Sequence, residues 1–253
     1  MFLIRIILDL DFFIVASIVL IIAAFVHGSI GFGFALIPTP IIAIFTDIQT
    51  AILLTLIPTL VVNLVSFLSE GNILDGFKKH MPLALLTMLG SAIGTQLLIM
   101  SNSELFKLLL AFIILIYLFV NKVNMSISIF KTYPKSSFVI YSLFTGVVGG
   151  LTNVMGPLLM IYGIELKYSK AELIQAMNIS FLFGKIIQIV VFLINGSFTS
   201  EHLSFSFMAI FIISFSLYLG IKLKKRMDIK VYLKVIRAVL FIISLILIAQ
   251  VII

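Results

Sequence analysis

The sequence predicts an all-α polytopic membrane protein built from two homologous halves. Of its 253 residues, 62% are hydrophobic and only 11% are charged, and the mean hydropathy is +1.30. Soluble domains carry about 25% charged residues, and one core of this size could not hide so much apolar surface from water. A lipid bilayer is the solvent that accommodates such a chain. The order in which its apolar stretches recur is the second observation.

Apolar stretches divide the chain into segments of membrane-spanning size. A spanning helix needs about 20 apolar residues, and most of the stretches approach that length. The first and the fifth are too long for one crossing. The stretches are 12–46, 49–68, 81–100, 104–120, 137–164, 171–194, 203–221 and 231–252.

Both long stretches are interrupted in the middle. Residues 27–33, His-Gly-Ser-Ile-Gly-Phe-Gly, come before Pro38 and Pro40, and residues 146–153, Gly-Val-Val-Gly-Gly-Leu-Thr-Asn, come before Pro157. Glycine runs followed by proline weaken helix continuity. In a membrane, irregular backbone is tolerated only inside protein or beside water. We therefore expect each long stretch to form a broken helical hairpin with a protected turn.

The two breaks occupy corresponding places in an internal repeat. A Gly-x-x-Gly pair followed by proline occurs in each long stretch, and a Phe-Leu-x-x-Gly segment comes after each. This repeated order indicates a duplication, with an N-terminal repeat over 1–120, a connecting loop over 121–136 and a C-terminal repeat over 137–253. The matching segments are 28–31 and 146–149 for the glycine pairs, and 67–71 and 192–196 for Phe-Leu-x-x-Gly.

The distribution of Lys and Arg predicts how the halves are oriented. If every stretch crosses the membrane once, basic residues lie on both sides with little asymmetry. If each broken stretch returns to its own side, only Arg5 and Lys107 lie on one side, and the other loop lysines and arginines gather opposite them. The positive-inside rule favours this second arrangement. It makes the halves inverted repeats, each a broken hairpin followed by three spanning helices, with both termini outside. A parallel arrangement of four crossings per half is the alternative.

Lys185 is the most informative single residue, because an unpaired ammonium is costly inside a membrane. It lies well within the stretch 171–194, and no acidic residue is obviously placed inside a span to pair with it. Its long side chain could also snorkel toward an interface. A buried cation without a protein counter-ion suggests that an anion, or water in an open cavity, completes the site.

Polar side chains follow two of the predicted helices. Asn63 belongs to a narrow polar stripe in 49–68, and Asn178 and Gln188 share a face with Lys185. Residues of these types commonly hydrogen-bond between membrane helices. Because both polar faces are next to the breaks, we interpret them as the lining of a cavity. The stripe in 49–68 consists of Thr55, Thr59, Asn63 and Ser66.

Together, the breaks and the polar faces predict a binding site for a small oxyanion near the bilayer midplane. A half-helix that starts after a glycine turn directs N–H groups and its positive dipole end at the cavity. Close helix packing would explain the glycines alone. His27 could titrate near neutrality, but a lone His at a helix end is more often a hydrogen-bonding cap. The candidate substrate-binding residues are Gly28, Ser29, Gly31, Gly33, Asn63, Gly149, Gly150, Thr152, Asn153, Gly156, Asn178, Lys185 and Gln188.

Enzyme chemistry and cofactor binding are not indicated. The sequence contains no Cys and three His residues, without a His-Glu-x-x-His pair or a plausible Ser–His dyad. Neither glycine run leads into the Gly-Lys-Ser/Thr of a phosphate-binding loop. The net charge of +7 is better explained by membrane topology than by nucleic-acid binding. We expect no enzyme activity, no metal, no cofactor and no nucleic-acid partner.

In these motifs the chain resembles the TauE/SafE sulfite exporter family. The resemblance spans nearly the whole length and rests on residues 28–33 with Pro38, on 149–157, and on the helix endings at Gly71 and Gly196. One departure is the Gly-Phe-Gly of the first motif, where many members have more consecutive glycines. The resemblance implies a multi-pass protein of the bacterial plasma membrane that moves sulfite, sulfonates or related organosulfur anions.

The resulting hypothesis is alternating-access transport of a small sulfur-containing anion. Export is the favoured direction, because an inside-negative potential drives anions outward without a coupling ion. The alternative is a membrane scaffold or assembly subunit that does not transport. The expected partners are the anionic substrate and the lipid bilayer, with homo-oligomerisation left open.

Overall fold

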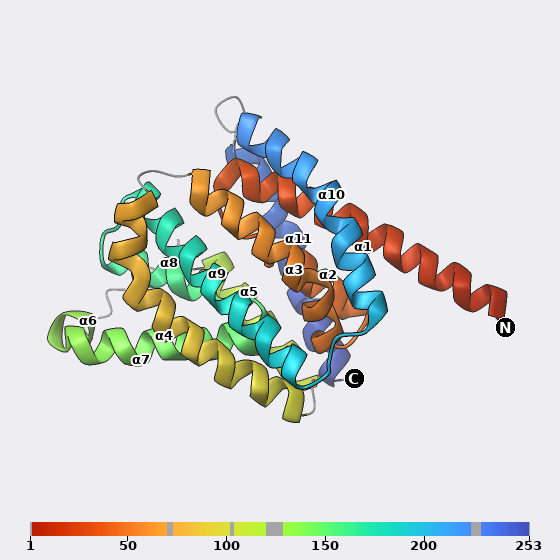
Figure 1. Ribbon diagram of the computed structural model, residues 1–253, viewed down its shortest axis with the longest axis horizontal. Coiled ribbons are helices and arrows are strands. Elements are labelled where there is room, and N and C mark those ends of the chain that lie inside the picture. The colour runs from red at the N-terminus through yellow and green to blue at the C-terminus, as the bar shows by residue number, and fades with distance from the viewer. Residues whose placement is uncertain (1, 70–72, 102–103, 120–128, 224–228, 253) are drawn as a thin grey trace.

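The computed structural model describes residues 2–69, 73–101, 104–119, 129–223 and 229–252, which contain helices and no strands (Figure 1). This confirms the predicted all-α class. The N-terminal half contains α1 (Phe2–Ile30), α2 (Pro38–Phe45), α3 (Ile48–Ser69), α4 (Ile73–Met100) and α5 (Glu104–Phe119). The short α6 (Ile129–Thr132) is followed by α7 (Pro134–Thr152), α8 (Gly156–Glu165), α9 (Lys170–Ile194), α10 (Ser200–Leu223) and α11 (Ile229–Ile252).

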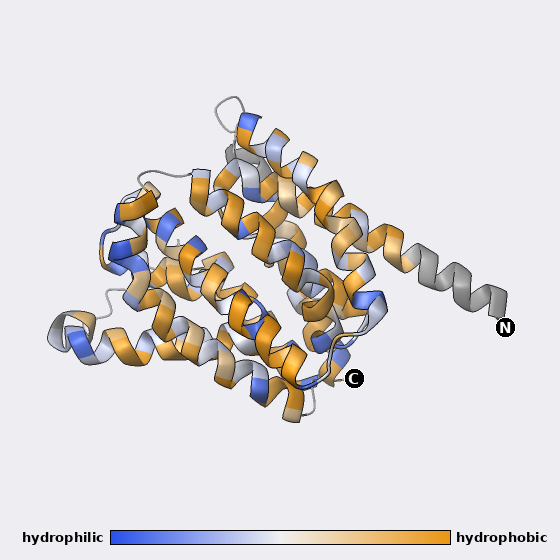
Figure 2. Cartoon of the chain, viewed as in Figure 1, coloured by the Kyte–Doolittle hydropathy of each residue, from blue (hydrophilic) through white to orange (hydrophobic). Residues whose placement is uncertain are grey.

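Helices of membrane-spanning length account for much of the molecule. Within the described ranges, five segments are long and apolar enough to cross a bilayer: Phe12–Ile30, Ile48–Ser69, Ile73–Met100, Lys170–Ile194 and Ser200–Leu223. Most of the helical ribbon is coloured as hydrophobic in Figure 2. Many of these apolar side chains face outward, among them Phe211, which is 80% exposed, and Ile140, which is 68% exposed. Such faces require lipid rather than water around them. The chain is a multi-pass membrane protein.

Both long stretches are broken where the glycine and proline pattern predicts. Residues 31–37 separate α1 from α2, and residues 153–155 separate α7 from α8. Proline opens each of the two short helices, at Pro38 and Pro157, because its fixed φ and missing N–H suit the first helical turn. Part of the predicted connecting loop, residues 121–128, lies outside the described residues, and so does Gly71 of the first Phe-Leu-x-x-Gly segment.

Helices α1 and α10 lie side by side and run in the same direction (Figure 1). The rings of Phe13 and Phe205 are 5.3 Å apart near one end of the pair. Further along, the Ser216 hydroxyl donates to the Ile21 carbonyl over 2.7 Å. At the far end, a Cβ added to Gly28 would lie 2.5 Å from the Leu217 carbonyl oxygen. Glycine is therefore required at that crossing.

Helices α7 and α4 form a second pair that also takes one helix from each half, and they too run in the same direction. A Cβ added to Gly146 would lie 2.1 Å from the Thr87 carbonyl oxygen, and one added to Gly150 would lie 2.5 Å from that of Ser91. In both pairs the small residues let two helix backbones approach closely, as is typical of membrane helices.

Helix α9 packs along α4 and contacts α3, which places its middle inside the bundle. Near the start of the α4–α9 pair, Lys79 forms an ion pair with Glu172. Near its end, the Asn195 side-chain amide donates to the Gln96 side-chain oxygen over 3.1 Å. The two helices therefore run in the same direction, and Lys185 lies midway along α9 between these contacts.

Candidate functional site

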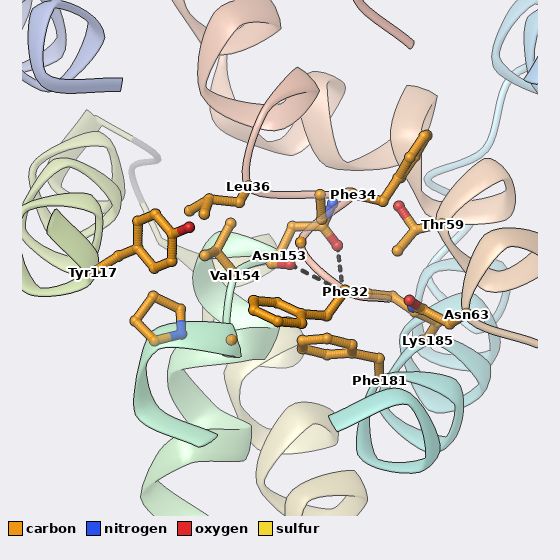
Figure 3. A pocket seen from close by; sticks show the side chains of 14 residues that line it. Phe32, Phe34, Leu36, Thr59, Asn63, Tyr117, Asn153, Val154, Phe181 and Lys185 are labelled. Atoms are coloured by element: carbon orange, nitrogen blue, oxygen red, sulfur yellow. Dashed lines mark hydrogen bonds between the residues drawn. The ribbon is translucent and has the colours of Figure 1, made fainter. Parts of the chain in front are cut away.

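Lys185 lies where the two breaks approach each other (Figure 3). Its side chain is 0% exposed, and it lines a small cavity together with residues of both breaks and of α3, α5 and α9. The space open to the centre of a water molecule is about 20 Å³, which is room for about one ordered water. The lining residues are Phe32, Gly33, Phe34, Ala35, Leu36, Thr59, Asn63, Tyr117, Asn153, Val154, Gly156, Pro157, Phe181 and Lys185.

The Lys185 ammonium is held by neutral oxygen atoms. It donates to the side-chain oxygen of Asn153, to the Asn153 backbone carbonyl over 3.3 Å and to the Gln188 side-chain oxygen over 2.7 Å. Within the described ranges, the ion pairs are Lys79–Glu172 and Lys107–Glu104, so no described carboxylate neutralises Lys185. Snorkelling does not occur, and no described carboxylate lies within ion-pair distance of Lys185.

The end of α7 provides most of this coordination. Gln188, which accepts from Lys185, donates its amide to the carbonyls of Gly149 and Gly150 over 3.5 and 3.3 Å. Asn153 is the C-cap of α7, with φ of 66°. A helix C-terminus carries a partial negative charge that favours a cation. Lys185 is therefore stabilised by the negative end of a broken helix, a contact that the sequence did not predict.

Asn153 also connects the two halves. Its side-chain amide donates to the hydroxyl of Thr39 over 2.8 Å and to that of Thr55 over 2.9 Å, and the two hydroxyls are 3.3 Å apart. Thr39 lies in the first turn of α2 and Thr55 in α3, both in the N-terminal half. A continuous polar chain thus runs from Lys185 through Asn153 into the other half.

The first break is stabilised mainly by its own backbone. Gly31 and Gly33 have φ of 102° and 94°, values that side chains other than glycine rarely adopt. The Gly31 N–H donates to the His27 carbonyl over 2.6 Å, and the Phe34 N–H donates to His27 Nδ1 over 3.1 Å. His27 therefore caps the end of α1, in agreement with its interpretation from the sequence.

The start of α2 offers few amide groups to a ligand, contrary to the expectation of two amide-rich half-helix ends. Pro38 and Pro40 have no N–H, and the Thr39 N–H donates to the Ala35 carbonyl over 3.3 Å. The start of α8 does reach the cavity, through Gly156 and Pro157. The two breaks therefore contribute unequally to the site.

Asn178 and Asn63 differ in whether their side-chain amides have hydrogen-bond partners. The Asn178 amide donates to the Gly31 carbonyl over 2.7 Å and to the Ile174 carbonyl over 2.9 Å, so Asn178 ties α9 to the first break. Asn63 lines the cavity and is 1% exposed, and its Nδ2 has no hydrogen-bond partner among the described residues. A buried donor without an acceptor is costly, and this one faces the space beside Lys185.

Comparison with known families identifies this architecture. The family model described as "Sulfite exporter TauE/SafE" matches residues 16–248, which is most of the chain. The chain belongs to this family. Searches of curated proteins and of solved structures found no match. The family assignment agrees with the resemblance seen in the glycine and proline motifs.

In this TauE/SafE family member, the residues predicted for the site fall into separate groups. Gly28, Ser29 and Gly150 lie at helix crossings: the Ser29 hydroxyl donates to the Gly220 carbonyl of α10 over 3.4 Å, and both glycines face neighbouring backbones. The Thr152 hydroxyl donates to the Val148 carbonyl over 2.7 Å and so turns back into α7. Four other predicted residues do not line the cavity but hydrogen-bond to each other next to it: the Asn178 amide donates to the Gly31 carbonyl, and the Gln188 amide donates to the Gly149 carbonyl. Of the predicted residues, the cavity is lined by Gly33, Asn63, Asn153, Gly156 and Lys185.

Other residues of the TauE/SafE cavity were missed from the sequence. Thr39 binds Asn153, and Phe32, Tyr117 and Phe181 form apolar walls. The second partner of Asn153, Thr55, belongs to the polar stripe that the sequence did indicate. The position of Thr39 between two prolines was the one available signal, because aromatic residues are frequent throughout this chain. Across the described ranges, no three His, Asp or Glu side chains are grouped closely enough to hold a metal ion.

Proposed function

We propose that this chain exports a small sulfur-containing anion, such as sulfite or a sulfonate, across the bacterial plasma membrane by alternating access. The observation that carries the proposal is the fully buried Lys185, without a described carboxylate partner, beside the unpaired Asn63 amide. Both groups are hydrogen-bond donors at the wall of one cavity. An anion that accepts from both would neutralise the charge and satisfy the buried amide.

The size of the cavity supports alternating access. Space for about one water molecule is too small for sulfite, which has three oxygen atoms around sulfur. The walls must therefore move apart as an anion binds, and the described conformation corresponds to a contracted state. Both breaks contribute to these walls, as in transporters whose site lies between two repeats.

The helix directions support the inverted arrangement of the halves. Helix α1 packs along α10, and α7 packs along α4. In the proposed repeats α1 corresponds to α7 and α4 to α10, so exchanging the halves maps one helix pair onto the other. Because α4, α7 and α9 run in the same direction, Lys79, Lys135 and Lys170 lie at one end of the bundle. Ser200, which follows the end of α9, lies at the opposite end. We assign the lysine-rich end to the cytoplasm.

The direction of transport follows from electrostatics. Moving one negative charge outward across a membrane with an inside-negative potential releases about 2.3 kcal/mol per 100 mV. Export therefore requires no coupling ion. Uptake would require one, and Lys185 has no described acidic neighbour that could form a proton relay with it.

Liposome reconstitution tests the proposal. Purified protein should carry sulfite and methanesulfonate under an imposed potential, and chloride much more slowly. Absence of flux for both sulfur anions under either polarity would reject transport and leave the scaffold alternative, in which Lys185→Ala changes complex formation rather than flux.

Cysteine labelling tests the topology separately, since the chain has no native Cys. Cysteines placed at Lys135 and Lys170 should react from the cytoplasmic side, and those at Thr46 and Ser200 from the outside. If the positions at Lys135 and Ser200 react from the same side, the inverted arrangement is wrong.

A further inference from the structure

Asn153 combines three properties that no other described residue of the site combines. It lines the cavity, its side-chain oxygen accepts from Lys185, and its amide nitrogen donates to Thr39 and Thr55 of the other half. The oxygen and the nitrogen belong to one rigid, planar amide group. Displacing the oxygen from Lys185 must therefore also disturb the nitrogen and its two threonine partners.

The hydrogen-bonding capacity of Lys185 makes such a displacement necessary. An ammonium has three N–H donors, and the structure assigns all three, to the side-chain oxygen and carbonyl of Asn153 and to Gln188. An anion can accept from Lys185 only by replacing one of these oxygens. Gln188 does not line the cavity, and its amide is tied to the α7 carbonyls. The backbone carbonyl of Asn153 is held in place by the end of α7, where Asn153 is the C-cap. The Asn153 side-chain oxygen, which can turn away, is therefore the acceptor that an anion in the cavity replaces.

We propose that Asn153 couples anion binding to the contact between the two halves. An anion at Lys185 displaces the Asn153 oxygen, and the movement of the amide weakens its bonds to Thr39 and Thr55. Without the anion, these bonds hold α2 and α3 of the N-terminal half against the end of α7. With the anion bound, the tie is released and the halves can separate. This inference rests on the proposed function, since it requires that an anion binds at Lys185.

The coupling predicts that removing hydrogen bonds strengthens anion binding. If the threonine hydroxyls hold Asn153 in the position that competes with the anion, then removing them should make the anion bind more tightly. Isothermal titration calorimetry of the purified protein in detergent, with methanesulfonate and with sulfite, should show a dissociation constant roughly three- to tenfold lower for Thr39→Val/Thr55→Val, the effect of about one hydrogen bond. A merely structural role for the threonines predicts equal or weaker binding.

A second variant should change affinity in the opposite direction. Asn153→Asp keeps the size of the side chain and the oxygen that faces Lys185, but adds a permanent negative charge at neutral pH. The carboxylate would occupy the position of the anion and form an ion pair with Lys185. Binding of both test anions should fall by at least roughly tenfold in a protein that remains folded.

Thr87→Val is the matched control. Thr87 is fully buried, and its hydroxyl donates only within its own helix, to Leu83 and Ala84. It should leave anion affinity unchanged. If the double threonine variant does not fold, Thr55→Val alone should shift the affinity in the same direction by a smaller factor.

The outcomes separate this inference from the proposed function. If the unmodified protein binds neither methanesulfonate nor sulfite, both are overturned. If it binds them and removal of the threonine hydroxyls leaves the dissociation constant unchanged or raises it, the coupling alone is overturned and the anion site remains.

Discussion

The two breaks share a glycine pattern but turn the chain by different means. The first takes seven residues, 31–37, and relies on positive φ at Gly31 and Gly33. The second takes three residues, 153–155, with positive φ at Asn153 alone. Asparagine tolerates the left-handed conformation better than most residues. The second break can therefore turn the chain and carry a polar side chain at the same position.

This difference divides the chemistry between the halves. The first break contributes backbone and the aromatic walls Phe32 and Phe34, and α3 contributes the neutral Asn63. The second break contributes Asn153, and α9 contributes the charged Lys185. In the proposed anion site, the side chain that would select the ligand by charge thus comes from the C-terminal half alone. The predictions below test how far this division of roles holds.

The largest expected effect comes from removing the charge. Lys185→Met keeps the length and apolar volume of the side chain but leaves the Asn153 and Gln188 oxygens without a donor. Because hydrogen bonds to charged groups contribute about 1.5–3 kcal/mol, sulfite flux into liposomes should fall about 100-fold. Lys135→Met, at an exposed position, should leave flux unchanged. Undiminished flux in Lys185→Met would mean that the charge does not lie in the transport path.

The next effect tests whether the two helix pairs are equivalent. A methyl group added at Gly146 or at Gly28 would lie 2.1 or 2.5 Å from a backbone oxygen of the neighbouring helix. Overpacking of this kind costs about 1–3 kcal/mol or more, so Gly146→Ala and Gly28→Ala should both unfold at clearly lower temperature in detergent, Gly146→Ala the lower. Gly156→Ala is the control, since its methyl group would meet Phe181 at an ordinary 3.4 Å. A loss of stability at Gly146 but not at Gly28 would show that the pairs are not equivalent.

The sequence was informative where a residue conflicted with its surroundings. Lys185 is a charge in an apolar helix, Asn63 belongs to a polar stripe, and the breaks combine glycine with proline in stretches too long for one crossing. Each conflict is local, so each can be recognised without knowing the packing. These features located the breaks and the residue at the centre of the candidate site.

The remaining features depend on packing, which the sequence does not display. Gly28 and Gly33 look alike in the first motif, yet Gly28 lies against α10 and Gly33 lines the cavity. Thr55 donates to its own helix as most helical threonines do, and only the fold brings Asn153 to it. The negative end of α7 beside Lys185 likewise results from the path of the chain after Thr152.

A smaller effect should come from Asn63, the neutral contribution of the N-terminal half. Asn63→Leu removes the unpaired buried amide, so the protein should be as stable as the original or more stable. Affinity for sulfite, measured by calorimetry, should nevertheless fall about three- to tenfold because one donor to the anion is lost. Ser206→Ala is matched to it: Ser206 is buried with an unpaired hydroxyl outside the cavity, and its replacement should not alter affinity. Unchanged affinity in Asn63→Leu would place the whole anion site in the C-terminal half.

The smallest effect tests whether the first break requires glycine or only positive φ. Gly33 has φ of 94° and open space around it, so a side chain there meets no neighbour, and only backbone strain of about 1–2 kcal/mol opposes it. Gly33→Ala should lower the unfolding temperature slightly. Gly33→Asn should lower it less, because asparagine adopts positive φ more readily, as Asn153 does in the second break. Equal destabilisation by Ala and Asn would show that a constraint other than φ requires glycine at this position, and that the two breaks differ in more than the residue that turns the chain.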